Sequence, residues 1–155
     1  MGKGRYVVST ADGTLSVRGA RGVRAQAAGQ ISAMFRVSGR GEVGLAADFN
    51  SSADSGSTMY ACWITNAGTA GCTRWVNDMR VDLAPYSSPD VVPNGDNTLI
   101  MRLQGTQLTT WINGGYAHVY NVQGTLGAGA WGPYVVSASG QGPVSGRYAW
   151  IELAR

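Results

Sequence analysis

Hydrophobic and polar residues alternate along this chain in short runs, without the spacing of a helix. Residues 14–18 (Thr-Leu-Ser-Val-Arg) and 79–83 (Met-Arg-Val-Asp-Leu) alternate at every position, which places their apolar side chains on one face of an extended strand. No window of eleven or more residues combines apolar residues at i, i+3, i+4 and i+7 with a capping residue. The sequence therefore predicts almost no helix.

The apolar runs are separated by turn residues, and together they predict about twelve strands. Glycine, serine, proline and the Asn113-Gly114 pair mark the boundaries. We expect strands at residues 5–9, 14–18, 30–37, 42–49, 58–65, 71–75, 79–83, 98–103, 107–112, 116–120, 131–137 and 147–153, with loops at 50–57 and 86–97. This pattern is typical of two antiparallel sheets packed face to face, so the predicted fold class is an all-β sandwich.

The length of 155 residues suits one domain, spanning residues 1–155, that is large enough to bury a core. We expect residues 1–4 to mark the boundary of a domain taken from a larger secreted or membrane-anchored chain. No apolar run is long enough to cross a bilayer, and no signal or transit peptide is recognisable. The sequence therefore predicts no membrane insertion.

The composition removes several kinds of catalytic site. The chain has one histidine, His118, and two glutamates, Glu42 and Glu152, so a histidine-rich zinc site or a serine triad lacks its raw material. Neither glutamate has an acidic partner at i+2 or i+4, and we interpret both as solvent-facing strand charges. A two-carboxylate site assembled across strands is the alternative. We expect His118 to be a surface or cross-strand residue.

The net charge of +3 is carried almost entirely by arginine, since Lys3 is the only lysine. Arg18, Arg21, Arg24, Arg36 and Arg40 give the first forty residues a positive bias. Such a bias suits nucleic acid or another anionic polymer. However, the arginines are not interleaved with aromatic residues as they are in RNA-binding strands, so we interpret them as solvent-facing charges and expect no nucleic-acid partner.

The two cysteines, Cys62 and Cys72, lie on either side of a turn at residues 66–69. A hairpin folded at this turn brings them opposite or nearly opposite each other, at about 4.5 Å between Cα atoms, which is close to disulfide reach. No metal or catalytic partner is nearby, so we favour a disulfide over two buried free thiols. A disulfide indicates an oxidising compartment.

Residues 97–115 resemble a recurrent segment of the concanavalin A-like lectin/glucanase (laminin-G-like) jelly rolls. The segment has an asparagine, an alternating strand, a polar residue with glycine, a second strand and an Asn-Gly pair. The hairpin from Tyr60 to Trp75 and the closing strand at 147–153 are similar to further parts of that family, and the resemblance covers roughly residues 14 to 155. It implies a jelly roll that serves mostly as an extracellular recognition module for glycans, polysaccharides or proteins.

The enzymes of that family carry Glu-x-Asp-x-Glu or a close variant along one strand, and this sequence lacks such a run. We therefore predict a non-catalytic module. Some laminin-G-like domains bind calcium, and Asp48, Asn50 and Asp54 are the candidate ligands for Ca²⁺ here. No other cofactor is expected.

The chain has five tryptophans and seven tyrosines but only two phenylalanines. Tryptophan and tyrosine combine an apolar ring with a polar group, which suits contact with sugar rings and protein interfaces. The candidate ligand-binding residues are Trp75, Asn77, Asp78 and Tyr86, with ordinary packing as the alternative. The expected function is binding of a glycan or cell-surface polysaccharide, outside the cell or at its surface. The alternatives are a protein-interaction, adhesion or assembly domain and, third, an unusual glycoside hydrolase.

Overall fold

The computed structural model describes residues 6–11, 13–17, 28–54, 56–124, 126–137 and 140–154. These residues form strands β1 (Tyr6–Thr10), β2 (Leu15–Val17), β3 (Gly29–Ser38), β4 (Glu42–Ser52), β5 (Gly56–Ile64), β6 (Thr69–Val76), β7 (Met79–Ser87), β8 (Asp96–Gln104), β9 (Gln107–Ile112), β10 (His118–Asn121), β11 (Ala130–Val136) and β12 (Val144–Ala154). No helix occurs among them, so the predicted all-β class is confirmed. In the same residues, no helix is therefore long and apolar enough to span a membrane.

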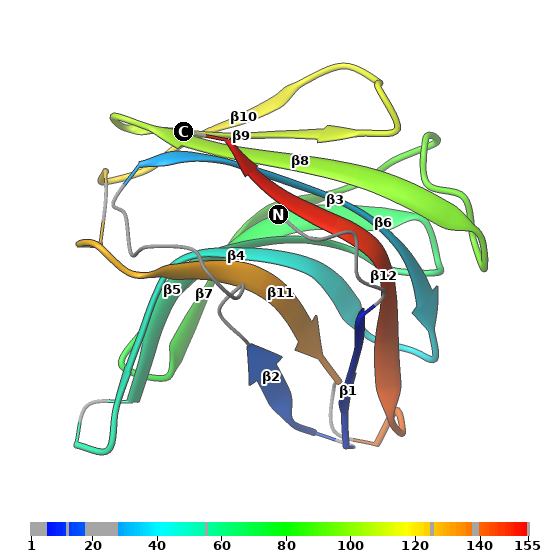
Figure 1. The fold of residues 1–155 in the computed structure, drawn as a ribbon, viewed down its shortest axis with the longest axis horizontal. Helices are drawn as coiled ribbons and strands as arrows, with labels where there is room; N and C mark the ends of the chain where they lie inside the picture. Colours follow the sequence, from blue (N-terminus) through cyan, green and yellow to red (C-terminus); the bar gives the residue numbers. More distant parts are fainter. Residues whose placement is uncertain are drawn as a thin grey trace.

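The strands form two six-stranded antiparallel sheets that stack in two layers (Figure 1). The first sheet has the order β1-β12-β3-β8-β9-β10, and the second has the order β2-β11-β4-β5-β6-β7. In each sheet a strand from the end of the chain lies between strands from its beginning: β12 between β1 and β3, and β11 between β2 and β4. The two sheets are therefore interwoven in sequence and form a jelly-roll sandwich.

Alternation along the strands fills the space between the layers. In β3 the buried side chains are Ile31, Ala33, Phe35 and Val37, while the intervening residues are more exposed. The second sheet contributes Leu45, Cys62, Cys72 and Trp131 among others to the same core cluster. Burial of this apolar surface is the main force that holds the sheets together.

The β4–β5 hairpin is longer than the sequence predicted. A loop was expected at residues 50–57, but β4 continues to Ser52 and β5 begins at Gly56. Beyond the irregularity between Ala47 and Asn50, the polar residues still pair, for example Ser51 with Ser57. Neither face of this extension is covered by the core. Apolar and polar residues therefore do not alternate along it, and the sequence gives no sign of strands there.

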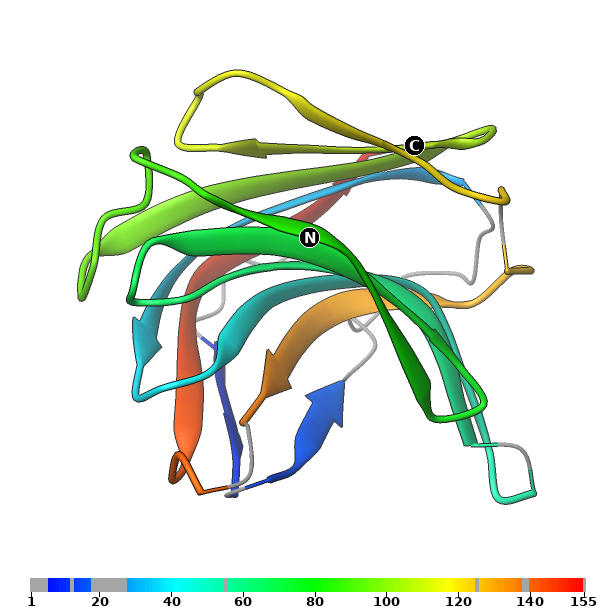
Figure 2. The ribbon, with the colours of Figure 1, turned by 180° about the vertical axis from the view of Figure 1, so that it is seen from behind.

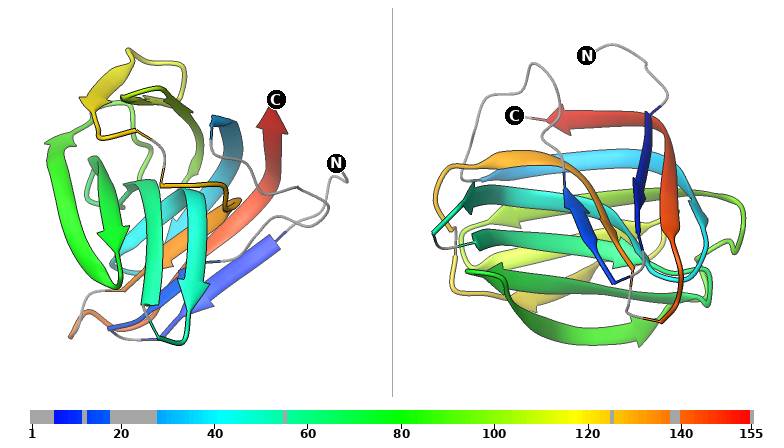
Figure 3. Two further views of the ribbon diagram at one scale, coloured as in Figure 1. Left: turned by 90° about the vertical axis from the view of Figure 1, so that its left-hand side faces the viewer. Right: turned by 90° about the horizontal axis from the view of Figure 1, so that it is seen from below.

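The second sheet bends into an arch whose concave side faces away from the first sheet (Figure 2). The view from below looks onto this outer face, with the second sheet nearest to the viewer (Figure 3). A second, smaller apolar cluster lies on this face and includes Ala46, Met59, Ala61, Trp63 and Tyr134. Buried aromatic residues on the outer side of a sheet are unusual, and they direct attention to this face.

Candidate functional site

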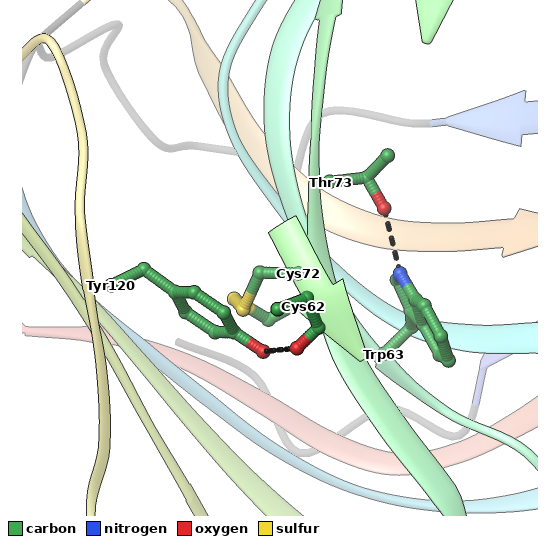
Figure 4. The surroundings of a disulfide bond; sticks show 6 residues. Cys62, Trp63, Cys72, Thr73 and Tyr120 are labelled. Atoms are coloured by element: carbon green, nitrogen blue, oxygen red, sulfur yellow. Dashed lines mark hydrogen bonds between the residues drawn. A yellow bond between two sulfur atoms is a disulfide. The ribbon is translucent and has the colours of Figure 1, made fainter. Parts of the chain in front are cut away.

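The Cys62–Cys72 hairpin joins the core to the outer face (Figure 4). The two cysteines are direct partners in the β5–β6 register and form a disulfide with 4.0 Å between their Cα atoms, as predicted. Trp63 follows Cys62, so its side chain points to the opposite face of the sheet. There its indole Nε1 donates a hydrogen bond of 2.7 Å to Oγ1 of Thr73.

Large side chains pack against small residues on the outer face. We call the set Glu42, Trp63, Trp75, Arg80 and Tyr134 the outer layer. It covers residues without bulk at paired positions of neighbouring strands: Gly44, Ala46, Ala61 and Gly71. A Cβ atom on Gly71 would come within 2.9 Å of the Trp63 ring, which indicates why glycine is needed beneath it.

Arg80 is the centre of the outer layer. Its guanidinium crosses from β7 above β6 and β5 to Glu42 on β4, and donates two hydrogen bonds of 2.9 and 2.5 Å to the two carboxylate oxygens. Its Nε donates a third bond of 2.7 Å to Asp82. The guanidinium carbon also lies 5.9 Å from the ring centre of Trp63 and 5.8 Å from that of Trp75, within the range of cation–π attraction.

Tyr134 extends the network to β11. Its hydroxyl accepts a 3.2 Å hydrogen bond from the indole Nε1 of Trp75 and donates one of 3.3 Å to Glu42. Trp75 and Tyr134 stand on β6 and β11, with β5 and β4 between them. Side chains of the outer layer therefore connect five strands of the second sheet, in addition to the backbone pairing of those strands.

Burial sets the electrostatics of these groups. Desolvation raises the pKa of Glu42, and the hydrogen bonds and charge of Arg80 oppose that rise. Burial alone would lower the pKa of Arg80, but the bonds to Glu42 raise it above its usual value. Desolvation also raises the pKa of Tyr134. Arg80 and the tyrosine hydroxyl therefore keep their protons at neutral pH.

The structure brings some of the predicted ligand-binding residues together. Trp75 belongs to the outer layer, and Asn77 and Asp78 form the adjoining β6–β7 turn, with φ angles of 51° and 65°. The Asp78 carboxylate accepts a 2.8 Å bond from the Ser57 amide, which holds the turn against β5. Tyr86 faces the other side of the sheet and stacks on His118 at 4.1 Å between ring centres.

Four members of the outer layer were not predicted as site residues: Glu42, Trp63, Arg80 and Tyr134. The interpretation of Glu42 as a solvent-facing charge is wrong, because its side chain is only 16% exposed and is paired with Arg80. A signal existed in the sequence. Once the hairpin register is known, alternation places residues 63, 73, 75, 80 and 82 on one face.

The predicted calcium ligands occupy two different places. Asp48 is fully buried near the end of β4, and its Oδ2 accepts a 3.1 Å bond from the Leu126 amide. The Asn50 side chain donates to the Asp48 carbonyl at 3.1 Å, so these two residues are adjacent. Asp54 lies in the exposed turn between β4 and β5. Binding of Ca²⁺ stays a prediction.

Asp48 is expected to make stability depend on pH. Burial raises its pKa to about 6, although hydrogen bonds from Leu126 and Trp131 oppose the rise. Because the folded state holds this proton more tightly than the unfolded state, the contribution of Asp48 to stability is greatest below about pH 4 and falls as the pH rises to about 6. The loss amounts to about 1–3 kcal/mol.

The measurement is urea unfolding with EDTA at several pH values between 4 and 7.5. Replacing Asp48 with asparagine, which also tolerates its positive φ of 55°, should remove this part of the slope. Asp54→Asn is the matched control and should leave the slope unchanged. Equal slopes for the Asp48→Asn variant and the unmodified protein would contradict the prediction.

Comparisons with solved structures show the same architecture. The chain superposes on the carbohydrate-binding module CBM66 from Bacillus subtilis with a TM-score of 0.60 and 12% identity, over 95% of each chain. It superposes on a β-glucanase from Bacillus licheniformis with a TM-score of 0.61 and 13% identity, over 86% of this chain and 69% of the other. Sheep galectin-11 gives a TM-score of 0.62 and 8% identity, over 92% and 98%.

These likenesses show that the chain has the concanavalin A-like jelly-roll fold that the sequence resembles. No protein-family model matches the sequence, and no curated protein matches it. The structural neighbours include both carbohydrate-binding proteins and glycosidases. A fold shared by binding modules and hydrolases does not by itself settle a function, so the residues of the site must carry that argument.

Proposed function

We propose that this protein is a non-catalytic module that binds glycans at the outer layer of its second sheet. The observation that carries the proposal is Arg80, which is held between two tryptophan rings and two carboxylates on one concave face. Trp75 is partly exposed, and the Asp82 side chain is 53% exposed, so a ligand can reach both. An aromatic ring packs on the C–H face of a sugar while carboxylate oxygens accept bonds from its hydroxyls.

The charges of the site favour a neutral saccharide. Glu42 and Asp82 carry two negative charges and Arg80 carries one positive charge, which leaves a net charge of −1. A carboxylated or sulfated sugar would meet this charge at close range and would also have to displace Glu42 from Arg80. A neutral sugar avoids both costs, since its hydroxyls donate to lone pairs that Arg80 leaves free.

The same bonds support binding rather than hydrolysis. A glycosidase needs one carboxylic acid that gives up a proton and one carboxylate that acts as base or nucleophile. Both oxygens of Glu42 accept bonds from Arg80, and Asp82 accepts a bond from the same guanidinium. Neither group is placed to work as the acid. The buried disulfide supports a location in an oxidising compartment, outside the cell or at its surface.

The test is a screen against a panel of neutral and acidic oligosaccharides, with and without Ca²⁺. We expect saturable binding to a neutral oligosaccharide, and we expect Trp75→Ala to weaken it about tenfold, as loss of an aromatic contact of about 1.5 kcal/mol would. Tyr116→Ala is the matched control, because Tyr116 is fully exposed in the β9–β10 loop, outside the outer layer. Asn77→Ala then tests whether the turn contributes.

A blank panel, or binding that Trp75→Ala leaves intact, would refute the glycan site. The alternative is then a protein-interaction role along β7. This strand lies at the edge of the second sheet, and its Met79 and Val81 side chains are exposed. An exposed strand edge with apolar side chains is a common place for a second chain to pair.

A further inference from the structure

The outer face of the first sheet carries an arginine and a tryptophan that the proposed glycan site does not use. Arg102 on β8 and Trp111 on β9 point outward from adjacent strands, two residue pairs apart in the register. The guanidinium of Arg102 lies 5.0 Å from the centre of the Trp111 ring. Arg102 is exposed and Trp111 is half-buried. The two side chains therefore form one stacked unit at the surface.

A hollow of about 360 Å³ lies beside this unit, and Arg102 is part of its wall. The register of β12, β3 and β8 explains its position, because Ala154 pairs with Gln30 and Gln30 pairs with Arg102. The small residues Gly29 and Ala154 leave the space, and Gln30 and Gln104 bring side-chain amides to it. The hollow thus combines room for a small group with hydrogen-bonding side chains and one cation.

Arg102 carries a charge that no carboxylate neutralises among the described residues. The ion pairs in that part of the chain join Arg36 to Asp96 and Arg80 to Glu42 and Asp82. The contact with Trp111 is one of charge with an aromatic ring rather than a hydrogen bond to an acceptor atom, so the guanidinium keeps N–H donors for a ligand. A stacked arginine is also oriented in advance, which lowers the entropy lost when it binds a ligand.

We propose that Arg102, Trp111 and the hollow form a second ligand site, for a saccharide that carries a carboxylate on its ring. The carboxylate would accept two parallel hydrogen bonds from the edge of Arg102. The sugar ring would occupy the hollow, where its hydroxyls would meet Gln30 and Gln104, while Trp111 would hold the Arg102 guanidinium in position. This face complements the outer layer, where the net negative charge favours neutral sugars. The protein would then bind two classes of saccharide on opposite faces.

The experiment is isothermal titration calorimetry with galacturonate trisaccharide, and with the neutral galactose trisaccharide of the same linkage as the comparison. At about 50 mM salt we expect the acidic trisaccharide to bind about tenfold more tightly at this site, because the difference is one charge-assisted, two-bond contact. Arg102→Gln should abolish the preference for the acidic sugar. Trp111→Ala should weaken binding of the acidic sugar.

Three controls separate this site from diffuse charge attraction, from the glycan site and from plain anion binding. Arg147→Gln removes another exposed arginine of the same face and should change the affinity less than twofold, or about 0.4 kcal/mol. Trp75→Ala alters only the glycan site on the other face and should leave acidic binding intact, so the two proposals succeed or fail separately. Inorganic sulfate serves as a competing anion without a sugar ring.

Equal affinity for the acidic and neutral trisaccharides in the Trp75→Ala variant, in which the outer layer binds neutral sugar weakly, would overturn the second site. An equal loss in Arg147→Gln and Arg102→Gln would also overturn it, because attraction would then come from diffuse positive charge. Sulfate that binds as tightly as the trisaccharide would show an anion site without saccharide recognition, which contradicts the assigned ligand class. Retention of the preference in Arg147→Gln with its loss in Arg102→Gln would support the proposal.

Discussion

Replacing Arg80 with methionine is expected to lower the free energy of unfolding by about 2–4 kcal/mol, because it leaves a largely buried carboxylate without its partner. Glu42 has only 16% of its side chain exposed, so water replaces the two lost hydrogen bonds poorly. Methionine keeps most of the apolar stem of Arg80, so the loss reports chiefly on charge and hydrogen bonding. Chemical denaturation followed by circular dichroism measures it.

Two controls test whether the loss comes from the unpaired buried charge of Glu42: a double variant that removes both charges, and a variant that breaks an exposed ion pair. In Arg80→Met combined with Glu42→Leu both charges are gone, and the stability should return to within about 1 kcal/mol of the unmodified protein. Arg36→Met breaks the exposed pair with Asp96, whose side chains are 49% and 58% exposed, and should cost at most about 1 kcal/mol. If Arg80→Met cost no more than Arg36→Met, the Arg80–Glu42 pair would be an ordinary surface contact.

The loss in Arg80→Met should also shrink as the pH falls. Burial already raises the pKa of Glu42, and removing Arg80 takes away the group that opposes this rise. Protonation of Glu42 then removes the unpaired charge, so the destabilisation is largest at neutral pH and smaller in acid. A cost that stays constant between pH 4 and 7 would assign the effect to packing instead.

The strands and the disulfide were predictable because their signals are local. The strand expected at residues 107–112 coincides with β9, since turns on both sides and an alternating interior fix its ends. The pairing of Cys62 with Cys72 followed from a single turn between them. Such features depend only on residues that are close together in the sequence, so they can be predicted from a single sequence.

The outer layer could not be predicted in the same way. Glu42, Arg80 and Tyr134 come from three distant parts of the chain, and only the order of strands in the sheet brings them together. The small residues beneath them, such as Ala46 and Ala61, gave β4 and β5 a continuous apolar pattern that does not show which face is outside. Long-range register, rather than residue type, decides such a site.

Tyr86 shows how one irregularity changes a site assignment. Strict alternation from Arg80 and Asp82 would place residue 86 on the outer face, near Trp75. The register shifts between Ala70 and Cys72, so that Leu83 and Tyr86 both point into the core side. A β-bulge reverses the phase of every residue that follows it. Tyr86 and Trp75, which the sequence analysis grouped in one site, therefore lie on opposite faces of the second sheet.

Reduction of the Cys62–Cys72 disulfide is expected to lower the free energy of unfolding by about 3 kcal/mol. The bond closes a loop with a sequence separation of 10, and the chain-entropy relation gives about 2.7 kcal/mol for a loop of that length. Both cysteines are fully buried, so the bond should be reduced in urea before refolding. Unfolding curves with and without dithiothreitol then give the difference, and mass spectrometry verifies the redox state.

Replacing both cysteines with alanine provides the control, because this variant should not respond to dithiothreitol. It should be less stable than the reduced protein, since the core that contains Cys62, Cys72 and Tyr120 loses two sulfur atoms and gains a cavity (Figure 4). A loss of about 3 kcal/mol is a large share of a typical domain's 5–15 kcal/mol. The fold would then be more stable in an oxidising compartment than in a reducing one, and equal stability of the reduced protein would remove this support for the proposed extracellular location.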